Sequence, residues 1–386
     1  MKKLLKVIRR ELAIWSKRPV YIIGSVVVMA FCSVFYLTFM DKGVPDDVPI
    51  GVVDLDNSTL TRNFIRQLDA TQLGEVIRYP DFASARADMQ KGVITSVCLL
   101  PEGMYADVQA HRKPCFTFYV NTLYFLGGSL AYKDILTMIN LTSGAVQREE
   151  LRLRGVDEAS IMGQLRPLDI DIHMPGNPTM NYGAYLSNMM LPGVLEMVIV
   201  MLIIYSLGTE LKYSTSVNLL EKTGNSILTA VGGKLTLYTA LFTFLAFSLE
   251  FILYGWMKFP LSGNIGWMLL DSFLLVIASE AIGVFIIGCV PVLRFALSIG
   301  ALYSVMAFSM TGFTLPVETM PAGIQGISVI FPLRHYYQMY VQCGMFGTGF
   351  AGCWKEIIHM LVFCFVPLAA IPRLHKAYLY QNYPKK

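Results

Sequence analysis

The stretch "AYLSNMMLPGVLEMVIVMLIIYSL", residues 184–207, carries a single charged residue, Glu196. A helix needs roughly 20 apolar residues to cross a bilayer core of about 30 Å. The stretch is therefore predicted to span a membrane. The whole chain agrees, because 54% of its residues are hydrophobic and 15% are charged, against about 25% charged in a soluble domain. A net charge of +4 does not suggest a nucleic-acid partner.

Further segments have the length and composition of a membrane-crossing helix: 19–40, 231–254, 266–290, 295–313 and 354–372. The first of them could be read as a secretory signal, but its apolar run is long for one and no A-x-A cleavage site follows. We therefore predict an α-helical polytopic membrane protein with six transmembrane helices. Its expected location is the inner (cytoplasmic) membrane.

The distribution of Lys and Arg predicts the orientation, since short cytoplasmic loops carry an excess of both. A cytoplasmic N-terminus leaves only Lys258, Arg334 and Lys355 in the two short external connections. Both termini, including the tail 373–386, are therefore expected in the cytoplasm. The residues then on the cytoplasmic side are Lys2, Lys3, Lys6, Arg9, Arg10, Lys17, Arg18, Lys212, Lys222, Lys234, Arg294, Arg373, Lys376, Lys385 and Lys386.

Residues 1–18 are expected to form an amphipathic helix in the cytoplasmic interface of the membrane. Most of the lysines and arginines of this segment suit contact with anionic headgroups. A plain topology signal would explain these charges, but it would not need a sustained apolar stripe. One helical face gathers that stripe: Leu4, Leu5, Ile8, Leu12 and Trp15.

Residues 41–182 are expected to form an extracytoplasmic α/β domain inserted between the first and second spans. Strand-like runs such as "VPIGVVDLD" (48–56) and "GVITSVCLL" (92–100) alternate with helical runs, and a return strand is predicted over 165–173. The domain has no G-x-S-x-G, H-E-x-x-H or C-x-x-C motif, and its histidines lack ligand spacing. We predict no catalytic residue, no metal site and no enzyme activity.

Two cysteine pairs could form disulfides on the external side. Cys98 and Cys115 flank neighbouring strand candidates, and Cys343 and Cys353 share one connection. Sequence spacing does not decide the connectivity, so both pairs stay open.

The connection between the second and third spans, 208–230, is predicted to contain a short helix that meets a partner protein. In "GTELKYSTSVNLLEKTGNSILTAVGGK" (208–234), a polar helix has an apolar edge that includes Leu219 and Leu220, and Gly224-Asn225 closes it. A helix held along the membrane surface can press on a partner and transmit motion. The alternative is a solvated hairpin, which requires neither this length nor the leucine pair.

Carboxylates inside predicted spans are the second functional signal. A charge at the bilayer centre costs about 2.5–3.5 kcal/mol on insertion scales, so such groups face protein or water. Glu196 and Glu280 fall near the centre, where they could line a conduit for a cationic or amphiphilic substrate. The alternative is a protonated carboxyl that hydrogen-bonds between helices, and we favour it for Glu250 and Asp271.

Residues 314–353, after the fifth span, do not have the pattern of another crossing. "TGFTLPVETMPAGIQGISVIFPLRHYYQMYV" (311–341) is apolar, but prolines and glycines interrupt it. Irregular backbone at membrane depth is tolerated only where protein or water covers it.

Together these features resemble the ABC-2 type permeases, the membrane subunits of type V ATP-driven exporters, and in particular the subgroup with a large external domain between the first and second spans. The resemblance covers essentially the whole chain. Besides the interface helix, it rests on "VPIGVVDLDNSTLTRNFIRQLDAT" (48–71), "NPTMNYGAYLSNMMLPG" (177–193), the segment 210–234 and "TGFTLPVETMPAGIQGISVIFPLRHYY" (311–337).

The resemblance implies roles for individual residues. The stretch after the fifth span would form two re-entrant helices that cap the pathway. The residues that mark its bends are Pro316, Glu318, Pro321, Pro332 and Arg334. The region 208–230 would couple the permease to its ATPase, and the residues in that role are Glu210, Leu219, Leu220 and Glu221.

The resemblance also implies partners. The chain has no Walker A motif, G-x-x-x-x-G-K-[ST], so ATP and Mg²⁺ would bind a separate ABC ATPase subunit and this chain would hold no cofactor. Six spans make half a pore, so a second permease copy or a paralogue is expected. Membrane lipid and a periplasmic adaptor complete the expected partners.

We therefore predict a permease that exports an amphiphile, such as a drug or a lipid, out of the cytoplasm or the inner leaflet. The alternative is a membrane receptor whose external domain senses a ligand without transport. A permease would co-purify with an ATPase that it stimulates, and a receptor would not. A secondary transporter is a third possibility, but no internal repeat supports it.

Overall fold

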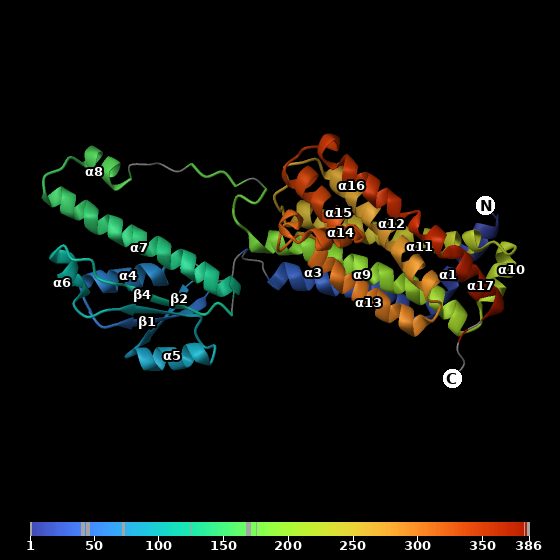
Figure 1. The fold of residues 1–386 in the computed structure, drawn as a ribbon, viewed down its shortest axis with the longest axis horizontal. Helices are drawn as coiled ribbons and strands as arrows, with labels where there is room; N and C mark the ends of the chain where they lie inside the picture. Colours follow the sequence, from blue (N-terminus) through green and yellow to red (C-terminus); the bar gives the residue numbers. More distant parts are fainter. Residues whose placement is uncertain are drawn as a thin grey trace. The chain divides into compact units, whose positions relative to one another are not determined.

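The computed structural model describes residues 2–39, 43, 47–71, 74–123, 125–166, 171–174, 176–381 and 383. These residues are mostly helical and form two compact units (Figure 1). The first unit combines residues 1–41 with residues 173–386, and the second comprises residues 42–172.

The described part of the first unit contains six helical segments long and apolar enough to cross a membrane. Each overlaps one of the predicted spans, as expected of a multi-pass membrane protein. Their bounds are Val20–Phe39, Tyr182–Lys212, Ile227–Trp256, Ile265–Cys289, Leu293–Met310 and Phe350–Tyr380.

Three of these segments are single helices, and three are composite. The single helices are α9 (Tyr182–Lys212), α12 (Ile265–Cys289) and α13 (Leu293–Met310). The first span comprises α2 (Val20–Ile22), a π-helical stretch (Ile23–Val27) and α3 (Val28–Phe39), and the third continues α11 (Ile227–Glu250) into a π-helical stretch (Phe251–Trp256). The sixth comprises α16 (Phe350–Phe363), a 3₁₀ turn (Val366–Ala369) and α17 (Ile371–Tyr380).

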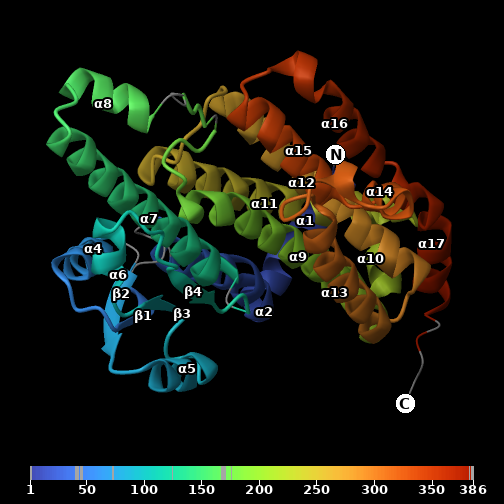
Figure 2. The ribbon, with the colours of Figure 1, turned by 60° about the vertical axis from the view of Figure 1, so that its left-hand side comes forward.

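α9 and α12 form the centre of the first unit. The most apolar windows of these helices are 67% and 78% buried, whereas those of the other spans are between 17% and 28% buried. α9 lies between α12 and α13 and packs against both (Figure 2). Small residues bring these helices close, since Gly283 of α12 faces Ile203 of α9 and Gly193 of α9 faces Phe308 of α13. Membrane helices commonly pack closely through such residues.

α1 (Lys2–Lys17) packs on α11 with a face that includes only part of the predicted apolar stripe, since Trp15 contacts Tyr238 of α11. It buries Val7 and Glu11. Leu5 and Leu12 of the predicted stripe are 48% and 49% exposed. The helix therefore has one face against the protein and a separate apolar edge at the surface. Contact is close because Val7 lies over Gly233 of α11, which has no side chain.

After α13 the chain turns back through short helices. These are a 3₁₀ turn (Val317–Thr319), α14 (Ala322–Ser328), α15 (Pro332–Met339) and a π-helical stretch (Tyr340–Met345). Pro316 and Pro321 directly precede the first two, and Pro332 is the first residue of α15, where its fixed φ suits a helix start. Arg334 closes the bend, since its Nη1 donates to the Gln325 carbonyl at 3.1 Å and to Ser328 Oγ at 2.6 Å.

The second unit is built on a four-stranded sheet with the order β2-β1-β3-β4. β1 pairs in parallel with β2 and β3, and β4 runs antiparallel to β3. The strands are β1 (Val48–Asp54), β2 (Gly74–Tyr79), β3 (Ser96–Leu100) and β4 (Thr117–Val120). The helices are α4 (Thr59–Asp69), α5 (Phe82–Gln90), α6 (Met104–Gln109), α7 (Phe125–Leu153) and α8 (Glu158–Leu165).

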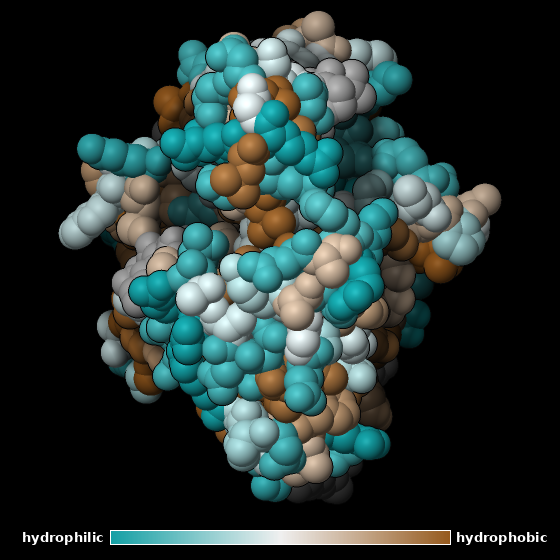
Figure 3. Space-filling view, turned by 90° about the vertical axis from the view of Figure 1, so that its left-hand side faces the viewer, coloured by the Kyte–Doolittle hydropathy of each residue, from teal (hydrophilic) through white to brown (hydrophobic). Residues whose placement is uncertain are grey.

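Helices cover both faces of this sheet. Ile50 and Val52 of β1 pack in one core with residues of α4 and α7, and Val53 packs in a second core with Ala85 of α5 (Figure 1). The alternation follows from the two-residue period of a strand. The surface of this unit that faces the viewer in Figure 3 is largely hydrophilic, with scattered hydrophobic side chains.

The structure answers part of two expectations, on the return strand and on the cysteine pairs. Residues 171–173 of the predicted return strand are not in a strand, and residues 167–170 lie outside the described part of the chain. Of the cysteine pairs left open, Cys98 is buried and Cys115 is exposed, and the structure contains both as free thiols. Cys343 and Cys353 are also free, and both Sγ atoms approach the Gly349 carbonyl, at 3.2 and 3.3 Å.

The contact between α1 and α11 makes a testable prediction. Gly233→Ala is expected to lower the melting temperature of the detergent-purified protein, because the new Cβ would lie 2.8 Å from Val7 Cβ and 2.9 Å from Val7 Cγ1. Overpacking of this kind costs about 1–3 kcal/mol. Gly232→Ala is the matched control, since nothing lies within 4 Å of its added Cβ and the gain in helix propensity is the same. Equal melting temperatures for the two variants would contradict the close approach.

Candidate functional site

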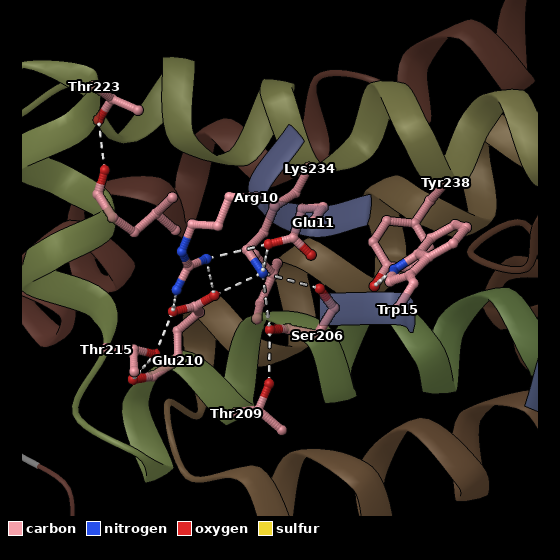
Figure 4. A network of polar contacts seen from close by, with 12 residues as sticks. Arg10, Glu11, Trp15, Ser206, Thr209, Glu210, Thr215, Thr223, Lys234 and Tyr238 are labelled. Atoms are coloured by element: carbon pink, nitrogen blue, oxygen red, sulfur yellow. Dashed lines mark hydrogen bonds and ion pairs between the residues drawn. The ribbon is translucent and has the colours of Figure 1, made fainter. Parts of the chain in front are cut away.

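Four charged side chains from three helices meet inside the first unit. α1 supplies Arg10 and Glu11, α9 supplies Glu210 and α11 supplies Lys234 (Figure 4). The side chains of Glu11, Glu210 and Lys234 are 0%, 3% and 2% exposed, and that of Arg10 is 16% exposed. We refer to these four residues as the charge cluster.

Each carboxylate of the charge cluster contacts both cations. Arg10 binds Glu210 in a bidentate manner, with Nη1 2.6 Å from Oε1 and Nη2 2.8 Å from Oε2. Lys234 Nζ lies 2.7 Å from Glu11 Oε1 and 2.9 Å from Glu210 Oε1. Arg10 Nη1 lies 3.2 Å from Glu11 Oε1, and Lys234 also donates to Ser206 Oγ at 3.2 Å. The formal charges of the four residues therefore cancel within one network.

The contribution of the charge cluster to stability depends on the balance of its charges. Taking an ion out of water costs several kcal/mol, and only well-placed partners compensate for it. Burial lowers the pKa of the Arg10 guanidinium, but its hydrogen bond to Glu210 and the charges of Glu210 and Glu11 outweigh burial and raise that pKa above its usual value. Removing any one member leaves a buried charge uncompensated. The cluster therefore holds α1, α9 and α11 in one relative position.

The spacing of residues in the sequence explains how α1 and α11 present contacting side chains to each other. Val7, Glu11 and Trp15 follow one another at intervals of four residues, so they share a helical face. Opposite them on α11 stand Gly233, Lys234 and Tyr238 in the same order. Trp15 Nε1 donates to Tyr238 Oη at 3.0 Å, and the two rings meet edge to face with centroids 4.9 Å apart (Figure 4).

The cluster continues into α10 (Ser216–Thr223). The Glu210 carbonyl accepts a hydrogen bond from the Thr215 amide at 2.9 Å, and the Thr215 hydroxyl donates to the Glu210 carboxylate. α10 starts at the next residue, where Ser216 Oγ donates to the Tyr378 carbonyl of α17 at 2.9 Å. Tyr378 Oη in turn donates to the Leu207 carbonyl of α9 at 2.9 Å. α10 is thus tied to α9 and α17 by hydrogen bonds.

Leu219 and Leu220, which were predicted to contact the partner ATPase, lie inside the first unit. They are 0% and 1% exposed and belong to its main core. The physical reason is that the apolar edge of α10 packs on α1 and α11. Glu221 is exposed, with Asn218 and Lys222 beside it. Glu210 lies in the charge cluster.

The two candidate conduit carboxylates, Glu196 and Glu280, are 1% and 3% exposed. Glu280 Oε2 accepts a hydrogen bond from Thr239 Oγ1 of α11 at 2.7 Å, and Glu280 also lines a cavity of about 250 Å³ beside α11 and the sixth span. Its other oxygen and both oxygens of Glu196 have no hydrogen-bond partner within the described residues. Within the described part of the chain, Glu196 and Glu280 are not hydrogen-bonded to each other, so they do not form one site.

The other two carboxylates within spans differ from each other. Glu250 Oε1 accepts hydrogen bonds from Ser272 Oγ of α12 and from Tyr336 Oη of α15, the latter at 3.3 Å. It connects three helices, which fits an interhelical role. Asp271 is fully buried, and neither of its oxygens has a partner among the described residues.

Sequence reasoning used Arg10 and Lys234 only as orientation signals and did not single out Glu11. One signal was present: Lys234 lies inside the predicted span 231–254, and a cation at that depth requires a carboxylate partner. Nothing local identified that partner, because Glu11 is more than 200 positions away in the chain. A second group, of two histidines and a glutamate, was also missed and is described below.

Charge balance in the cluster makes a second prediction. Lys234→Met is expected to destabilise the protein by about 3–5 kcal/mol, because Arg10 alone then faces two buried carboxylates. The double variant Lys234→Met/Glu11→Leu restores the balance and is expected to recover most of the loss. Thermal unfolding in detergent measures both, with Lys222→Met on the exposed face of α10 as control. Strictly additive losses in the double variant would rule out the coupling.

Comparison with known proteins identifies the family. A search of curated proteins gives no match. A protein-family model described as "ABC-2 family transporter protein" matches residues 19–371, which is most of the 386-residue chain. The match begins at the first span and ends in the sixth, so it includes α9, α10 and α11 of the site. It confirms the resemblance at the level of the family: this chain belongs to the ABC-2 transporter family.

Proposed function

We propose that this chain is the permease subunit of an ABC exporter, and that a separate ATPase subunit drives it through α10 and the charge cluster. Membership of a family of transport subunits supports the first part. This sequence contains no Walker A motif, which is consistent with ATP hydrolysis on a separate subunit. The observation that carries the second part is the continuous polar connection from Thr215, next to α10, through Glu210 to Arg10 and Lys234.

The geometry suggests how motion would pass through this connection. A partner pressing on the exposed face of α10 (Asn218, Glu221 and Lys222) would push its buried leucines into the core. Because Glu210 is bound to Arg10 and Lys234, its movement alone would leave Glu11 as the single carboxylate of the cluster facing both cations. α1, α9 and α11 would therefore shift together, and the displacement of α10 would reach the spans.

The proposed orientation of the chain rests on the end of the first unit that contains α10. α10, α17 and the N-terminus lie together there (Figure 1), and we assign this end to the cytoplasm because the lysines and arginines of the short loops concentrate on it. Residues 42–172 leave the opposite end of the first span, so this assignment makes them external. With this orientation, residues 314–353 would form a cap on the outer side. This orientation also favours the ABC-2 subgroup that has a large external domain between the first and second spans.

We further propose that the substrate is an amphiphile and that a second permease subunit completes the pathway. Six spans enclose half a pore. The buried carboxyl of Glu196 has no hydrogen-bond partner among the described residues, and in the assembled transporter water or substrate would supply one. Glu280, beside its cavity, would contribute from α12. A receptor without transport remains the competing function, and it would not stimulate an ATPase.

The coupling proposal is tested by Glu221→Lys. Reversal of a charge on the exposed face of α10 is expected to weaken association with the co-expressed ATPase at least tenfold, about 1.4 kcal/mol, and to reduce ATP hydrolysis in proteoliposomes accordingly. The melting temperature should not change, because the side chain is at the surface. Arg294→Glu, an exposed charge reversal on the same side, is the control. Wild-type association and hydrolysis in Glu221→Lys would refute docking at this face.

The conduit proposal is tested by Glu196→Gln and Glu280→Gln. Glutamine keeps the size and the hydrogen-bonding capacity but removes the charge, so stimulation of ATP hydrolysis by a cationic amphiphile should fall about tenfold, as for a loss of about 1.4 kcal/mol. Glu250→Gln is the matched control, since its carboxyl already has interhelical partners. If all three variants respond like the wild type, these carboxyls only join helices.

A further inference from the structure

A second polar group lies between α15 and α16. α15 supplies His335, and α16 supplies Glu356 and His359. Their side chains are 2%, 11% and 47% exposed, and one nitrogen or oxygen of each lies within 4.8 Å of the others. The two imidazole rings face each other with centroids 4.7 Å apart.

One hydrogen bond of His335 requires a proton on Nε2. Nε2 lies 2.9 Å from the Val329 carbonyl, which can only accept, so Nε2 donates. Nδ1 lies 2.5 Å from Glu356 Oε2 and points toward the centre of the group. A histidine bound to a metal shows this arrangement, with one nitrogen on the ion and the other donating to a backbone carbonyl.

The residues of α16 complete the geometry. Glu356 and His359 are three positions apart, so they lie on one helical face. His359 Nδ1 is 3.6 Å from Glu356 Oε2, long for a hydrogen bond but close to the distance of about 3.4 Å between two ligands of a tetrahedral zinc ion. The contact between His335 and Glu356 would lengthen by about 1 Å around such an ion.

A neighbouring amide supports the carboxylate. With the amide nitrogen of Gln338 turned toward α16, it donates to Glu356 at 3.2 Å from Oε1 and 3.3 Å from Oε2. Hydrogen bonds from the surroundings commonly orient a carboxylate that binds a metal. Beside the group lies a cavity of about 490 Å³, whose lining is apolar apart from Tyr303, His335 and His359. It leaves room for a fourth ligand, such as water.

We propose that His335, Glu356 and His359 bind a zinc ion that clamps α15 to α16. Two imidazoles and one carboxylate with an open fourth position form a common zinc ligand set, whereas Ca²⁺ and Mg²⁺ prefer oxygen ligands. The ion would join the re-entrant segment to the sixth span. The proposal stands apart from the transport function, because the site lies on other helices and its test requires no ATPase.

The test uses tag-free full-length protein in detergent, stripped with a chelator and titrated with Zn²⁺. One zinc ion per chain is expected, together with a rise in melting temperature, since a ligand that binds only the folded state stabilises it. Proton release is also expected, because zinc replaces protons on its ligands. Co²⁺ at the same site should produce the visible absorption of a four-coordinate ion.

Variants of the ligands distinguish zinc binding at this site from zinc binding at other histidines. Glu356→Gln and His359→Gln are expected to weaken zinc binding at least about 100-fold, since loss of a mere supporting residue already costs about 10–100-fold. His359 is half exposed, so its variant should fold. His375→Gln on α17 is the matched control and should bind like the wild type. The competing account is a metal-free ion pair of His335 and Glu356. Absent zinc binding in the wild type, or unchanged affinity in both variants, would overturn the proposal.

Discussion

The buried ammonium of Lys234 is the constraint on which the first unit depends. A cation inside an apolar helix is stable only if carboxylates reach it, and here they come from α1 and α9. Arg10 then offsets the second negative charge. The absence of a side chain at Gly233 lets α1 approach closely enough for Glu11 to reach Lys234. An N-terminal helix that could lie loosely on the membrane is thereby fixed to the transmembrane core.

This arrangement gives the coupling region a defined mechanical position. α10 is not a free loop, because its apolar edge is buried and Thr215 and Ser216 at its start are hydrogen-bonded to α9 and α17. Its outward face is charged and polar. An element with one side embedded in the core and the other exposed can receive a force and transmit it. In the proposed coupling, the charge cluster would make α1, α9 and α11 respond together.

Polar groups elsewhere in the first unit follow the same rule with different outcomes. Glu250 obtains partners from neighbouring helices, and His335 pairs with Glu356 between α15 and α16. Glu196 is buried and has no such partner among the described residues. Neighbouring helices thus supply hydrogen-bond partners to some of these buried groups and not to others.

The amino-acid sequence by itself determined the six apolar segments, the α/β character of the region between the first two, and the family resemblance, because hydropathy, periodicity and motifs are local properties. It also indicated that the connection 208–230 contains a short amphipathic helix. Only the tertiary structure decided that Leu219 and Leu220 face inward, that Glu11 is the partner of Lys234 and that His335 meets Glu356. These contacts join residues far apart in the chain, and helix packing, which no local pattern encodes, brings them together.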